Sequence, residues 1–498
     1  MRVGILELLV DTANEHTASA FARYLRRQYY SIMPQAVAVW CRELGRRVSY
    51  ATYYGQASPD RLLPDDLDVV FIAAYTQSAA LAYVLAKLFR EKGALTVLGG
   101  PHAKAFPETC LRHVDLVVKE CDKTLIADIL SGQFDPPAVI SSGRGPTGLP
   151  SVEERMPEIA ATAFPAGRPS RVSMIALLSS LGCPYSCDFC TDWNTRYVVM
   201  PPDQLAADLR FVADRFPQVL VAFHDPNFAV RFDETMAVLE SVPKGRRNRY
   251  VMESSLSILK ASRLKELKET NCYFVAPGVE SWDDYSNKAG TSGKHGRQKL
   301  EQVVDHFRCL KEVVPGLQAN FLFGTDLDRG REPVELTIEF MRRLPYVWPG
   351  VNIPTPFGGT PLFDRYLAEG RILKAFPIEL YFAPYLATTL KHYEPLEYYS
   401  LMIEIYEAMT SRTMLARRLA TSGRPAIGFA HVLRTWAMRQ ELAEMRVIRA
   451  QLASDATFRA FHEGRNQVLP EFYHRRYEQR LGPYAGLLAR AERVSVFG

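Results

Sequence analysis

The sequence has little net charge and few cysteines, and both shortages narrow the classes of protein to which it can belong. Its 60 basic and 55 acidic residues leave a net charge of +5 over 498 residues, which is near neutral for this length. Eight cysteines in so long a chain exclude a disulfide framework, and they fit a reducing cytoplasm. Five of them are scattered, and we predict that most are buried core thiols: Cys41, Cys110, Cys121, Cys272 and Cys309.

Long uncharged runs are also nearly absent. The first ten residues, MRVGILELLV, lack an apolar stretch of signal-peptide length and are interrupted by Glu7, so we predict a strand there. Residues 69–86 form an 18-residue run without a charge, which reaches the length of a membrane span. Because the polar residues 76–78 break this run, we predict a buried strand at 69–75 followed by a capped helix at about 78–91. No transmembrane segment is expected.

The first 135 residues alternate between strand and helix patterns. The helical patterns at 33–45 and 81–93 each end in glycine, a common helix stop. This alternation predicts an α/β fold, here a doubly wound Rossmann-like domain with a parallel sheet between helices. The predicted strands are 2–10, 46–54, 67–75, 94–100 and 114–119.

Ligands bind to such a sheet at the carboxyl ends of its strands. Thr76, Gln77 and Ser78 follow one predicted strand, and Gly99 and Gly100 follow the next. The glycines would let a ligand approach the backbone closely. We therefore expect a binding site along this edge.

A second alternating region follows a linker. Residues 136–168 are rich in Pro, Gly and Ser, which predicts the linker. Residues 169–375 contain six strand signals, which predict a partial (β/α)6 barrel with its site at the strand carboxyl ends. The strand signals are 172–178, 219–225, 249–255, 272–280, 319–326 and 351–356. Polar residues at those ends are Asp225, Asn227, Glu253, Glu280 and Asp326.

Residues 376–498 are predicted to form a C-terminal helical region. From residue 411 onward it holds 15 Arg, no Lys and 7 acidic residues. Two interpretations stay open: a solvated helical cap, or a basic face for a phosphorylated or otherwise anionic substrate. The arginines are dispersed and no RNA-binding module is visible, so no nucleic-acid partner is expected.

The stretch CPYSCDFC concentrates three cysteines, Cys183, Cys187 and Cys190, within eight positions. Gly182 and Pro184 disfavour a helix, and the preceding apolar run predicts that the cysteines lie on a loop leaving a strand. A disulfide would leave one thiol over, and a closed zinc site normally has four ligands. Three thiolates on a tight loop suit a four-iron cluster with one iron open.

This loop and several other segments resemble the radical S-adenosylmethionine (SAM) superfamily. In that family C-x3-C-x-φ-C, with φ aromatic, binds a [4Fe–4S] cluster, and φ is Phe189 here. The combination is typical of members with an N-terminal cobalamin (B12)-binding-type domain, and it covers roughly residues 30–395. The other matching segments are HDPNF (224–228), PGVES (277–281), ANFLFGTDLD (319–328), TPFGGTPLFDRYLAEGRIL (355–373) and GGPHAKAFPETCLRHVDLVVKECDKT (99–124).

The resemblance implies roles for individual residues. The three cysteines would hold the cluster, whose open iron would chelate SAM, and reductive cleavage of SAM would give a 5′-deoxyadenosyl radical. Phe189 would lie along the adenine, with core packing as the other interpretation. Glu253 and Glu280 would bind the ribose and amino group of SAM or form structural salt bridges. Asp225 and Asn227 would contact SAM or cap the following helix.

The N-terminal domain leaves the cobalamin question open. Thr76, Ser78, Gly99 and Gly100 are the candidate cobalamin contacts. The Asp-x-His-x-x-Gly motif that many relatives use to supply a histidine to cobalt is missing. Either cobalamin binds without a protein ligand below the cobalt, or the domain keeps the fold and has lost the cofactor.

The two cases imply different reactions. With cobalamin, the resemblance implies methylation of an unactivated carbon in a small-molecule, lipid or natural-product substrate. Without it, a radical C–C bond formation, cyclisation or rearrangement is expected. Either reaction needs an electron donor of the flavodoxin or ferredoxin type. Two further alternatives are a tRNA methylthiotransferase-like RNA modifier and a non-catalytic protein that binds zinc through the three cysteines.

Overall fold

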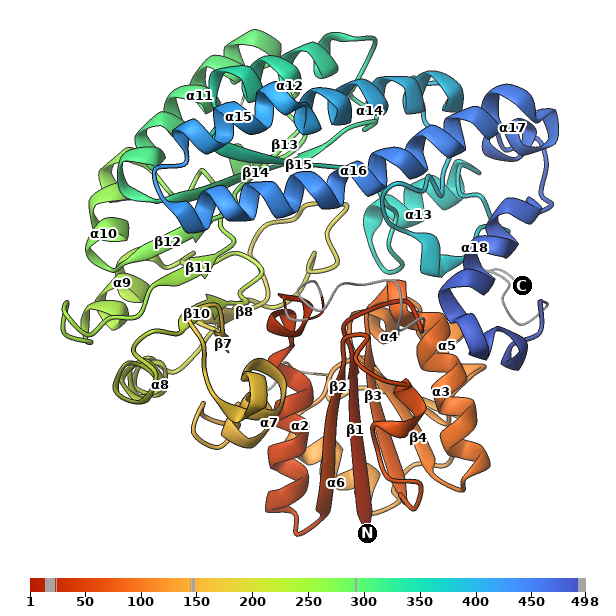
Figure 1. Ribbon diagram of the computed structural model, residues 1–498. Helices are drawn as coiled ribbons and strands as arrows, with labels where there is room; N and C mark the ends of the chain where they lie inside the picture. Colours follow the sequence, from red (N-terminus) through yellow and green to blue (C-terminus); the bar gives the residue numbers. More distant parts are fainter. Residues whose placement is uncertain (14–22, 24, 144, 146–147, 292, 491–498) are drawn as a thin grey trace.

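The computed structural model describes every residue except 14–22, 24, 144, 146–147, 292 and 491–498. Two parallel sheets organise it, and helices cover both (Figure 1). The N-terminal sheet stands below the second sheet in this view, and the carboxyl ends of its strands point toward it. The predicted α/β class is confirmed.

The N-terminal sheet has six parallel strands in the described part of the chain. Its order reverses direction between β1 and β3, and in a doubly wound sheet this switch point is where ligands bind. In sheet order the strands are β2 (Arg47–Tyr53), β1 (Arg2–Leu8), β3 (Val69–Ala74), β4 (Leu95–Gly99), β5 (Leu116–Val118) and β6 (Ala138–Ile140).

Helices pack on both faces of this sheet. Alternate strand residues point to opposite faces, so Val3 and Ile5 share a core with α2 and α6, whereas Leu6 and Leu8 share one with α3. The helices are α2 (Ile32–Glu43), α3 (Ala79–Glu91), α4 (Pro101–Ala105), α5 (Pro107–Leu111) and α6 (Lys123–Leu130).

The uncharged run at 69–86 forms β3 and the start of α3, with a 3-10 turn, η3 (Thr76–Ser78), between them. Both predicted elements are therefore confirmed, but the predicted cap is wrong. The Ser78 hydroxyl donates to the Tyr75 carbonyl, and no side chain caps α3. Among the described helices, none is long and apolar enough to cross a bilayer.

The predicted linker at 136–168 is not only a connection. Its first residues add β6 to the edge of the sheet, and a later segment forms α7 (Met156–Ala163). The Arg155 guanidinium, which is 2 % exposed, donates to Gln35 of the first domain and to the Ala176 carbonyl of the second. The Pro- and Gly-rich composition predicts the turns of this segment, but it does not predict the two short elements β6 and α7.

The second sheet forms the predicted partial barrel. Six parallel strands are present as predicted, but the sixth occupies 347–352 rather than 351–356. The predicted strand 272–280 is divided at Pro277, and its second part, β13 (Gly278–Glu280), pairs with β14. In sheet order the barrel strands are β7 (Met174–Leu177), β10 (Leu220–Phe223), β11 (Tyr250–Met252), β12 (Cys272–Val275), β14 (Gly316–Leu322) and β15 (Val347–Asn352). The helices between and after them are α8 (Pro202–Arg215), α9 (Phe232–Glu240), α10 (Leu264–Glu269), α11 (Gly296–Val313), α12 (Glu332–Arg343) and α13 (Pro361–Ala368).

The C-terminal region is helical from residue 395 onward. It crosses the barrel and then returns to the N-terminal domain (Figure 1). There Arg480 pairs with Asp11, and the Lys87 ammonium donates to the Leu487 carbonyl (2.9 Å). The helices are α14 (Pro395–Thr410), α15 (Arg412–Thr421), α16 (Pro425–Ser454), α17 (Ala456–His462) and α18 (Glu471–Leu481).

Candidate functional site

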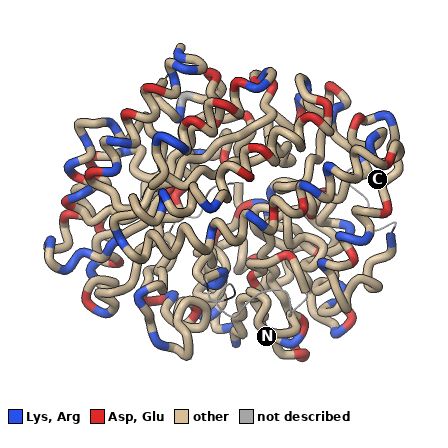
Figure 2. The backbone as a smooth tube through the Cα atoms, turned by 45° about the horizontal axis from the view of Figure 1, so that its top comes forward, with Lys and Arg blue, Asp and Glu red and all other residues tan. Residues whose placement is uncertain are grey.

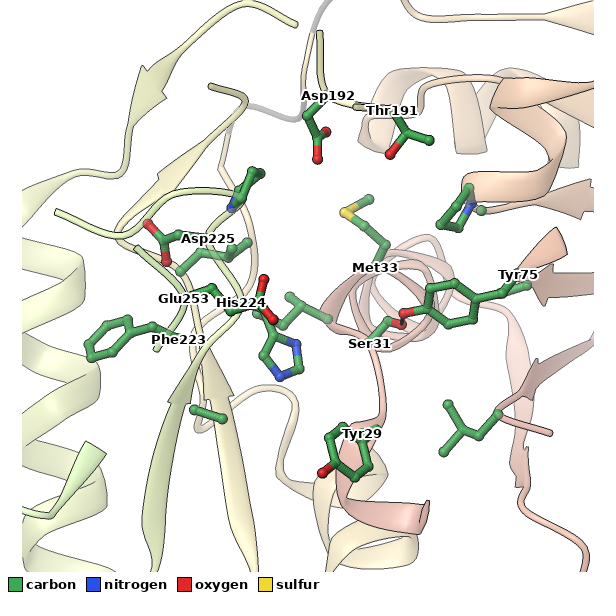
Figure 3. Close-up of a pocket in the computed structure, with 18 of the residues that line it drawn as sticks. Tyr29, Ser31, Met33, Tyr75, Thr191, Asp192, Phe223, His224, Asp225 and Glu253 are labelled. Atoms are coloured by element: carbon green, nitrogen blue, oxygen red, sulfur yellow. Dashed lines mark hydrogen bonds between the residues drawn. The ribbon is translucent and has the colours of Figure 1, made fainter. Parts of the chain in front are cut away.

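A cavity of about 2140 Å³ lies where the two sheets meet. Figure 3 shows side chains of the N-terminal domain, such as Ser31 and Tyr75, facing His224 and Glu253 of the barrel across it. Pockets for a single drug-sized ligand rarely exceed about 1,000 Å³. The cavity therefore has room for more than one ligand.

The switch point of the N-terminal sheet forms one wall of the cavity. The Ser31 backbone N–H donates to Glu7 Oε1 (2.6 Å), and the Ser31 and Tyr75 hydroxyls lie 3.2 Å apart. Burial raises the pKa of Glu7 to about 7, although the hydrogen bonds from Ser31 oppose this rise. The sequence shows Glu7 only as a charge inside a strand, so its place at the cavity could not be inferred.

Three of the four predicted cobalamin contacts line this wall: Thr76, Gly99 and Gly100. Gly100 has φ +96°, and a Cβ there would lie 2.9 Å from the Ala74 carbonyl oxygen, so only glycine fits. Ser78 is the exception, because it is buried behind the wall with its hydroxyl on Tyr75. Glycine backbone thus forms part of this edge, beside the side chains of Tyr75 and Thr76.

The two described histidines of this domain, His102 and His113, do not line the cavity. His102 is fully buried, and its Nε2 lies 2.5 Å from the Tyr83 hydroxyl. His113 stacks on the same tyrosine ring at 4.0 Å. Burial lowers the pKa of His102 to about 3. His16 lies outside the described residues, so neither described histidine of the domain is placed to ligate a metal in the cavity.

The three cysteines lie on the predicted loop after β7. A two-stranded hairpin, β8 (Ser180–Leu181) and β9 (Val198–Val199), holds the base of the loop. Gly182 has φ +67°, and any Cβ there would collide with the Arg196 carbonyl oxygen. The loop residues on either side of the cysteines line the cavity, whereas the cysteines lie behind this lining.

One ammonium group faces all three thiols. Burial lowers the pKa of Lys288, but Glu280 and the thiols of Cys187, Cys190 and Cys183 outweigh burial and raise it. Burial raises the pKa of Cys187 to about 11, and Lys288 opposes this rise. A nearby cation favours thiolates, which are the form that binds iron. Lys288 could not be identified from the sequence, because no motif marks it.

All eight cysteines are free, as predicted for a chain without a disulfide framework. No group of three or more His, Cys, Asp and Glu among the described residues surrounds a single metal ion. A four-iron cluster takes each of the three thiolates on a different iron, so its ligands need not converge on one point. The donor set of three thiols and no fourth ligand fits such a cluster.

Glu280 and Glu253 are carboxylates without a protein donor. Glu280 is 7 % exposed, has φ +66°, and folds back into space that only Gly278 leaves open. Glu253 extends into the cavity. Neither carboxylate accepts a hydrogen bond within the described part of the chain. Burial raises the pKa of both, and Lys288 opposes the rise in each case.

An ionised carboxylate that is buried without a hydrogen-bond donor costs free energy, unless a ligand supplies the donors. The amino group and ribose hydroxyls of SAM are donors of the required kind. The predicted salt-bridge alternative is not found, since no ion pair within 4 Å involves Glu253 or Glu280 in the described chain. Both residues therefore fit the predicted role.

Asp225 holds the start of the cysteine loop. Its carboxylate accepts hydrogen bonds from the Ser179 backbone N–H (2.9 Å) and from the hydroxyls of Ser179 (2.5 Å) and Ser180 (2.7 Å). Asn227 donates to the Ser255 hydroxyl (3.4 Å). The helix-capping alternative is wrong, because no side chain caps α9. Contacts of Asp225 and Asn227 with SAM stay predictions.

Phe189 packs within the site on another ring. It stacks on Tyr285 with centroids 5.4 Å apart and an interplanar angle of 15°. The Tyr285 hydroxyl donates to Asp188 Oδ1 (3.4 Å), beside the cysteines. One face of Phe189 is thus occupied, and its contact with adenine stays a prediction.

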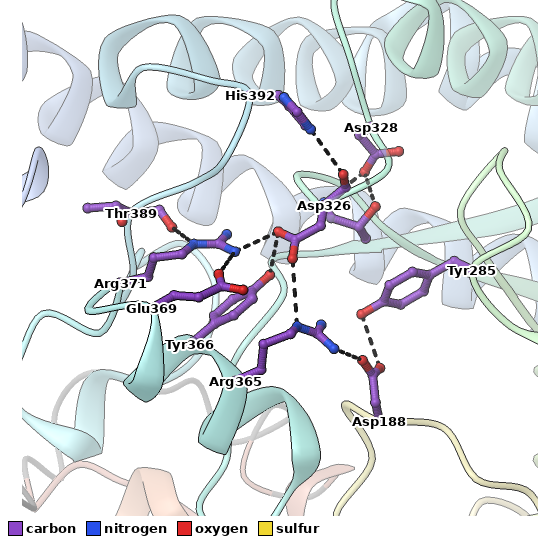
Figure 4. Close-up of polar contacts among 11 residues, drawn as sticks. Asp188, Tyr285, Asp326, Asp328, Arg365, Tyr366, Glu369, Arg371, Thr389 and His392 are labelled. Carbon is purple, nitrogen blue, oxygen red and sulfur yellow. Dashed lines mark hydrogen bonds and ion pairs between the residues drawn. The ribbon is translucent and has the colours of Figure 1, made fainter.

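A polar network fastens the cysteine loop to the segment after the last barrel strand (Figure 4). The Arg365 guanidinium donates to Asp188 (2.8 Å) and lies 3.8 Å from Asp326. Asp326 also pairs with Arg371 (2.8 Å) and accepts from the Tyr366 hydroxyl (3.1 Å). Sequence reasoning placed Asp326 at the rim but missed its partners on α13.

His224 is a cavity residue that the sequence did not single out by role. It follows β10 and projects beside Glu253 (Figure 3). Burial and, to a smaller extent, Arg155 lower its pKa to about 4. The imidazole is therefore neutral near pH 7 and can accept a hydrogen bond.

Comparison with known sequences places this site in context. The sequence profile of the Radical SAM superfamily matches residues 177–340. Bacteriochlorophyllide d C-8(2)-methyltransferase of Chlorobaculum tepidum is 26% identical over 383 residues, which are 71% of this chain and 80% of that protein. The C-12(1)-methyltransferase of the same organism is 24% identical over 61% of this chain and 67% of its own length.

Solved structures show the same fold. The cobalamin-dependent SAM radical enzyme OxsB, with aqua-cobalamin bound, has a TM-score of 0.58 at 12% identity, covering 92% of this chain and 74% of its own. The radical SAM methyltransferase TsrM from Kitasatospora setae, with cobalamin and a [4Fe–4S] cluster, has a TM-score of 0.53 at 15% identity. That match covers 74% of this chain and 75% of TsrM.

Proposed function

Because this chain belongs to the radical SAM superfamily and has an N-terminal domain of the cobalamin-binding type, we propose that it is a cobalamin-dependent C-methyltransferase. The single observation that carries the proposal is the shared cavity. The cysteine loop, through Gly182 and Thr191, and the edge of the N-terminal sheet, through Gly99 and Gly100, border the same space. A SAM site and a cobalamin site on these walls would face a common substrate.

Residues of the barrel would bind the cluster and SAM. Cys183, Cys187 and Cys190 would hold the [4Fe–4S] cluster, with Lys288 stabilising their thiolates. Glu280 and Glu253 would accept hydrogen bonds from SAM. When bound, the cluster and SAM supply a 5′-deoxyadenosyl radical, and cobalamin supplies the methyl group.

The N-terminal wall would hold cobalamin through backbone and hydroxyl contacts. Thr76, Gly99 and Gly100 are the contacts that line the cavity, and the buried Ser78 would support this wall from behind. Because His102 faces the interior of the domain, we propose that no histidine of this wall ligates cobalt from below.

The substrate proposed here is a bulky, mainly apolar small molecule, lipid or natural product. Support comes from the size of the cavity and from apolar side chains along it, such as Met33, Leu178 and Phe274. The relatives that methylate bacteriochlorophyllide make tetrapyrroles the first compounds to test. A flavodoxin- or ferredoxin-like protein is the proposed electron donor, and the free cysteines support a reducing cytoplasm.

The test is an anaerobic assay of the reconstituted enzyme with methyl-deuterated SAM, a reductant, cobalamin and a panel of tetrapyrroles and lipid extracts. We expect a product that has gained the labelled methyl group, together with S-adenosylhomocysteine and 5′-deoxyadenosine. Cys183→Ala should abolish the product, whereas Cys309→Ala, at an exposed cysteine outside the loop, should not. Formation of 5′-deoxyadenosine with an unlabelled, rearranged product would contradict methylation.

A further inference from the structure

We propose that helices α15 and α16 form a docking surface for an anionic lipid bilayer. This surface lies outside the chemistry proposed above. Residues 410–440 contain six arginines and no Asp, Glu or Lys. In a chain whose acidic and basic residues nearly balance, this segment carries charge of one sign only.

Large apolar side chains are exposed on the same two helices. Phe429 is 54% exposed, Trp436 53%, Leu419 46% and Val432 38%. Phe429, Val432 and Trp436 follow one another at helical spacing and share one face of α16. Leu419 of α15 packs against Gly428, next to Phe429, which joins both helices in one patch. Contiguous exposed apolar surface of this kind marks an interaction site.

The six arginines differ in their contacts. Arg434 is half-buried and lies over the Phe274 ring (5.1 Å), and Arg439 donates to the Thr410 carbonyl (2.9 Å). Arg418 is buried and donates to the Met409 carbonyl (2.6 Å), so it serves the fold. Arg412, Arg417 and Arg424 are exposed, and none forms an ion pair within the described part of the chain. Their charge is therefore available to an external anion. Exposed arginines beside Trp, Phe and Leu are the composition of a surface that lies on anionic lipid.

The patch borders an opening of the cavity. Phe429, Tyr29 (64% exposed) and Val172 (44% exposed) all line the cavity and are among the exposed large apolar side chains. A bilayer resting on α15 and α16 would therefore cover this opening. An apolar substrate dissolved in the bilayer would reach the cavity without crossing water, which is the one point at which the inference rests on the proposed function.

Other occupants fit the patch less well. A second copy of the chain would set arginines against arginines, because the segment offers no carboxylate. An acidic electron donor would dock far from the cysteine loop. Ile427 of α16 contacts the position of Gly316 at the start of β14, and Arg424 lies over Tyr273 near the start of β12 (5.8 Å). The cysteine loop instead leaves the carboxyl end of β7.

The experiment is vesicle co-sedimentation of the purified full-length chain at physiological salt. Phosphatidylglycerol-containing vesicles are compared with pure phosphatidylcholine vesicles. We expect partitioning at least tenfold stronger onto the anionic vesicles, with a blue shift of tryptophan fluorescence. Phe429→Ser combined with Trp436→Ser should lower partitioning at least tenfold and remove most of the shift. A variant in which Gln replaces Arg412, Arg417 and Arg424 should lose the preference for anionic over neutral vesicles.

Matched controls distinguish binding through this surface from non-specific binding of vesicles by other exposed residues. Val468→Ser removes an apolar side chain that is 71% exposed outside the patch and should leave partitioning unchanged. A variant in which Gln replaces Arg61, Arg210 and Arg329, three arginines exposed outside the patch, should also leave partitioning unchanged. Absence of vesicle binding, equal loss in the controls, or self-association that only the patch variants abolish would overturn the proposal. Neither cofactor nor substrate is needed, so failure here would leave the methylation proposal standing.

Discussion

Two glutamates, Glu280 and Glu379, are buried without an ion pair in the described part of the chain. Glu280 lies near Lys288 and beside the expected SAM site. Glu379, in the 3-10 turn η7 (Ile378–Leu380), is different, since it is 6% exposed and lies at the contact between the N-terminal domain and the segment after the barrel. Its Oε2 has no hydrogen-bond partner.

Replacing Glu379 by Gln should change the pH dependence of stability. Burial raises the pKa of Glu379 from 4.5 to about 7, so the folded state keeps a proton that the unfolded state releases between these values. Stability is therefore lost as pH rises through this window, by about 3 kcal/mol in total. We expect the thermal midpoint of Glu379→Gln, measured relative to the wild type, to rise between pH 5 and pH 8.

Glu312→Gln is the control, because Glu312 is exposed on α11. Its midpoint should follow the wild type across the same range. A Glu379→Gln variant whose midpoint runs parallel to the wild type from pH 5 to pH 8 would show that Glu379 is ionised in the folded protein.

At the scale of elements, the cysteine loop is fixed by contacts from distant parts of the chain. Asp225, 46 residues away, holds Ser179, and Arg365, 177 residues away, holds Asp188. The motif itself could be found from sequence because its residues are close together. The groups that position it could not, since their pairing depends on how the barrel closes.

Gly182→Ala should damage the loop locally. A Cβ at φ +67° would meet the Arg196 carbonyl, so β8 and β9 must shift and the cysteines move with them. We expect reconstituted protein to bind less than half of the wild-type iron while its helix content stays the same by circular dichroism. Gly245→Ala, with no atom near the added carbon, is the matched control. Full iron content in Gly182→Ala would contradict the assigned role.

The strands show where sequence reasoning succeeds and where it stops. Long β-branched runs such as 69–75 predicted their strands within a few residues, because burial on both faces demands continuous apolar sequence. The three-residue strand β6 was not predicted, and β13 was predicted only as the end of one continuous strand, 272–280, because Pro and Gly dominate the local pattern in both places. Their pairing is set by the neighbouring strands rather than by their own residues.

At the scale of the whole molecule, the chain turns the carboxyl edge of one sheet toward the other and closes the assembly with its C-terminal helices. The order of domains was readable from alternating patterns. How the domains face one another was not, because Arg155, Arg480 and Lys87 fix that geometry through long-range contacts. Figure 2 shows basic and acidic residues interspersed along most of the backbone, whereas residues 410–440 contain arginines and no acidic residue.

The most direct test of the account is the cobalamin content of the chain. The protein is purified anaerobically from cells supplied with cobalamin, its cluster is reconstituted, and cobalamin and iron are measured per chain. We predict near-stoichiometric cobalamin together with a full [4Fe–4S] cluster that is lost on Cys183→Ala. A protein that holds its iron and forms 5′-deoxyadenosine from SAM, but binds no cobalamin, would contradict the central claim.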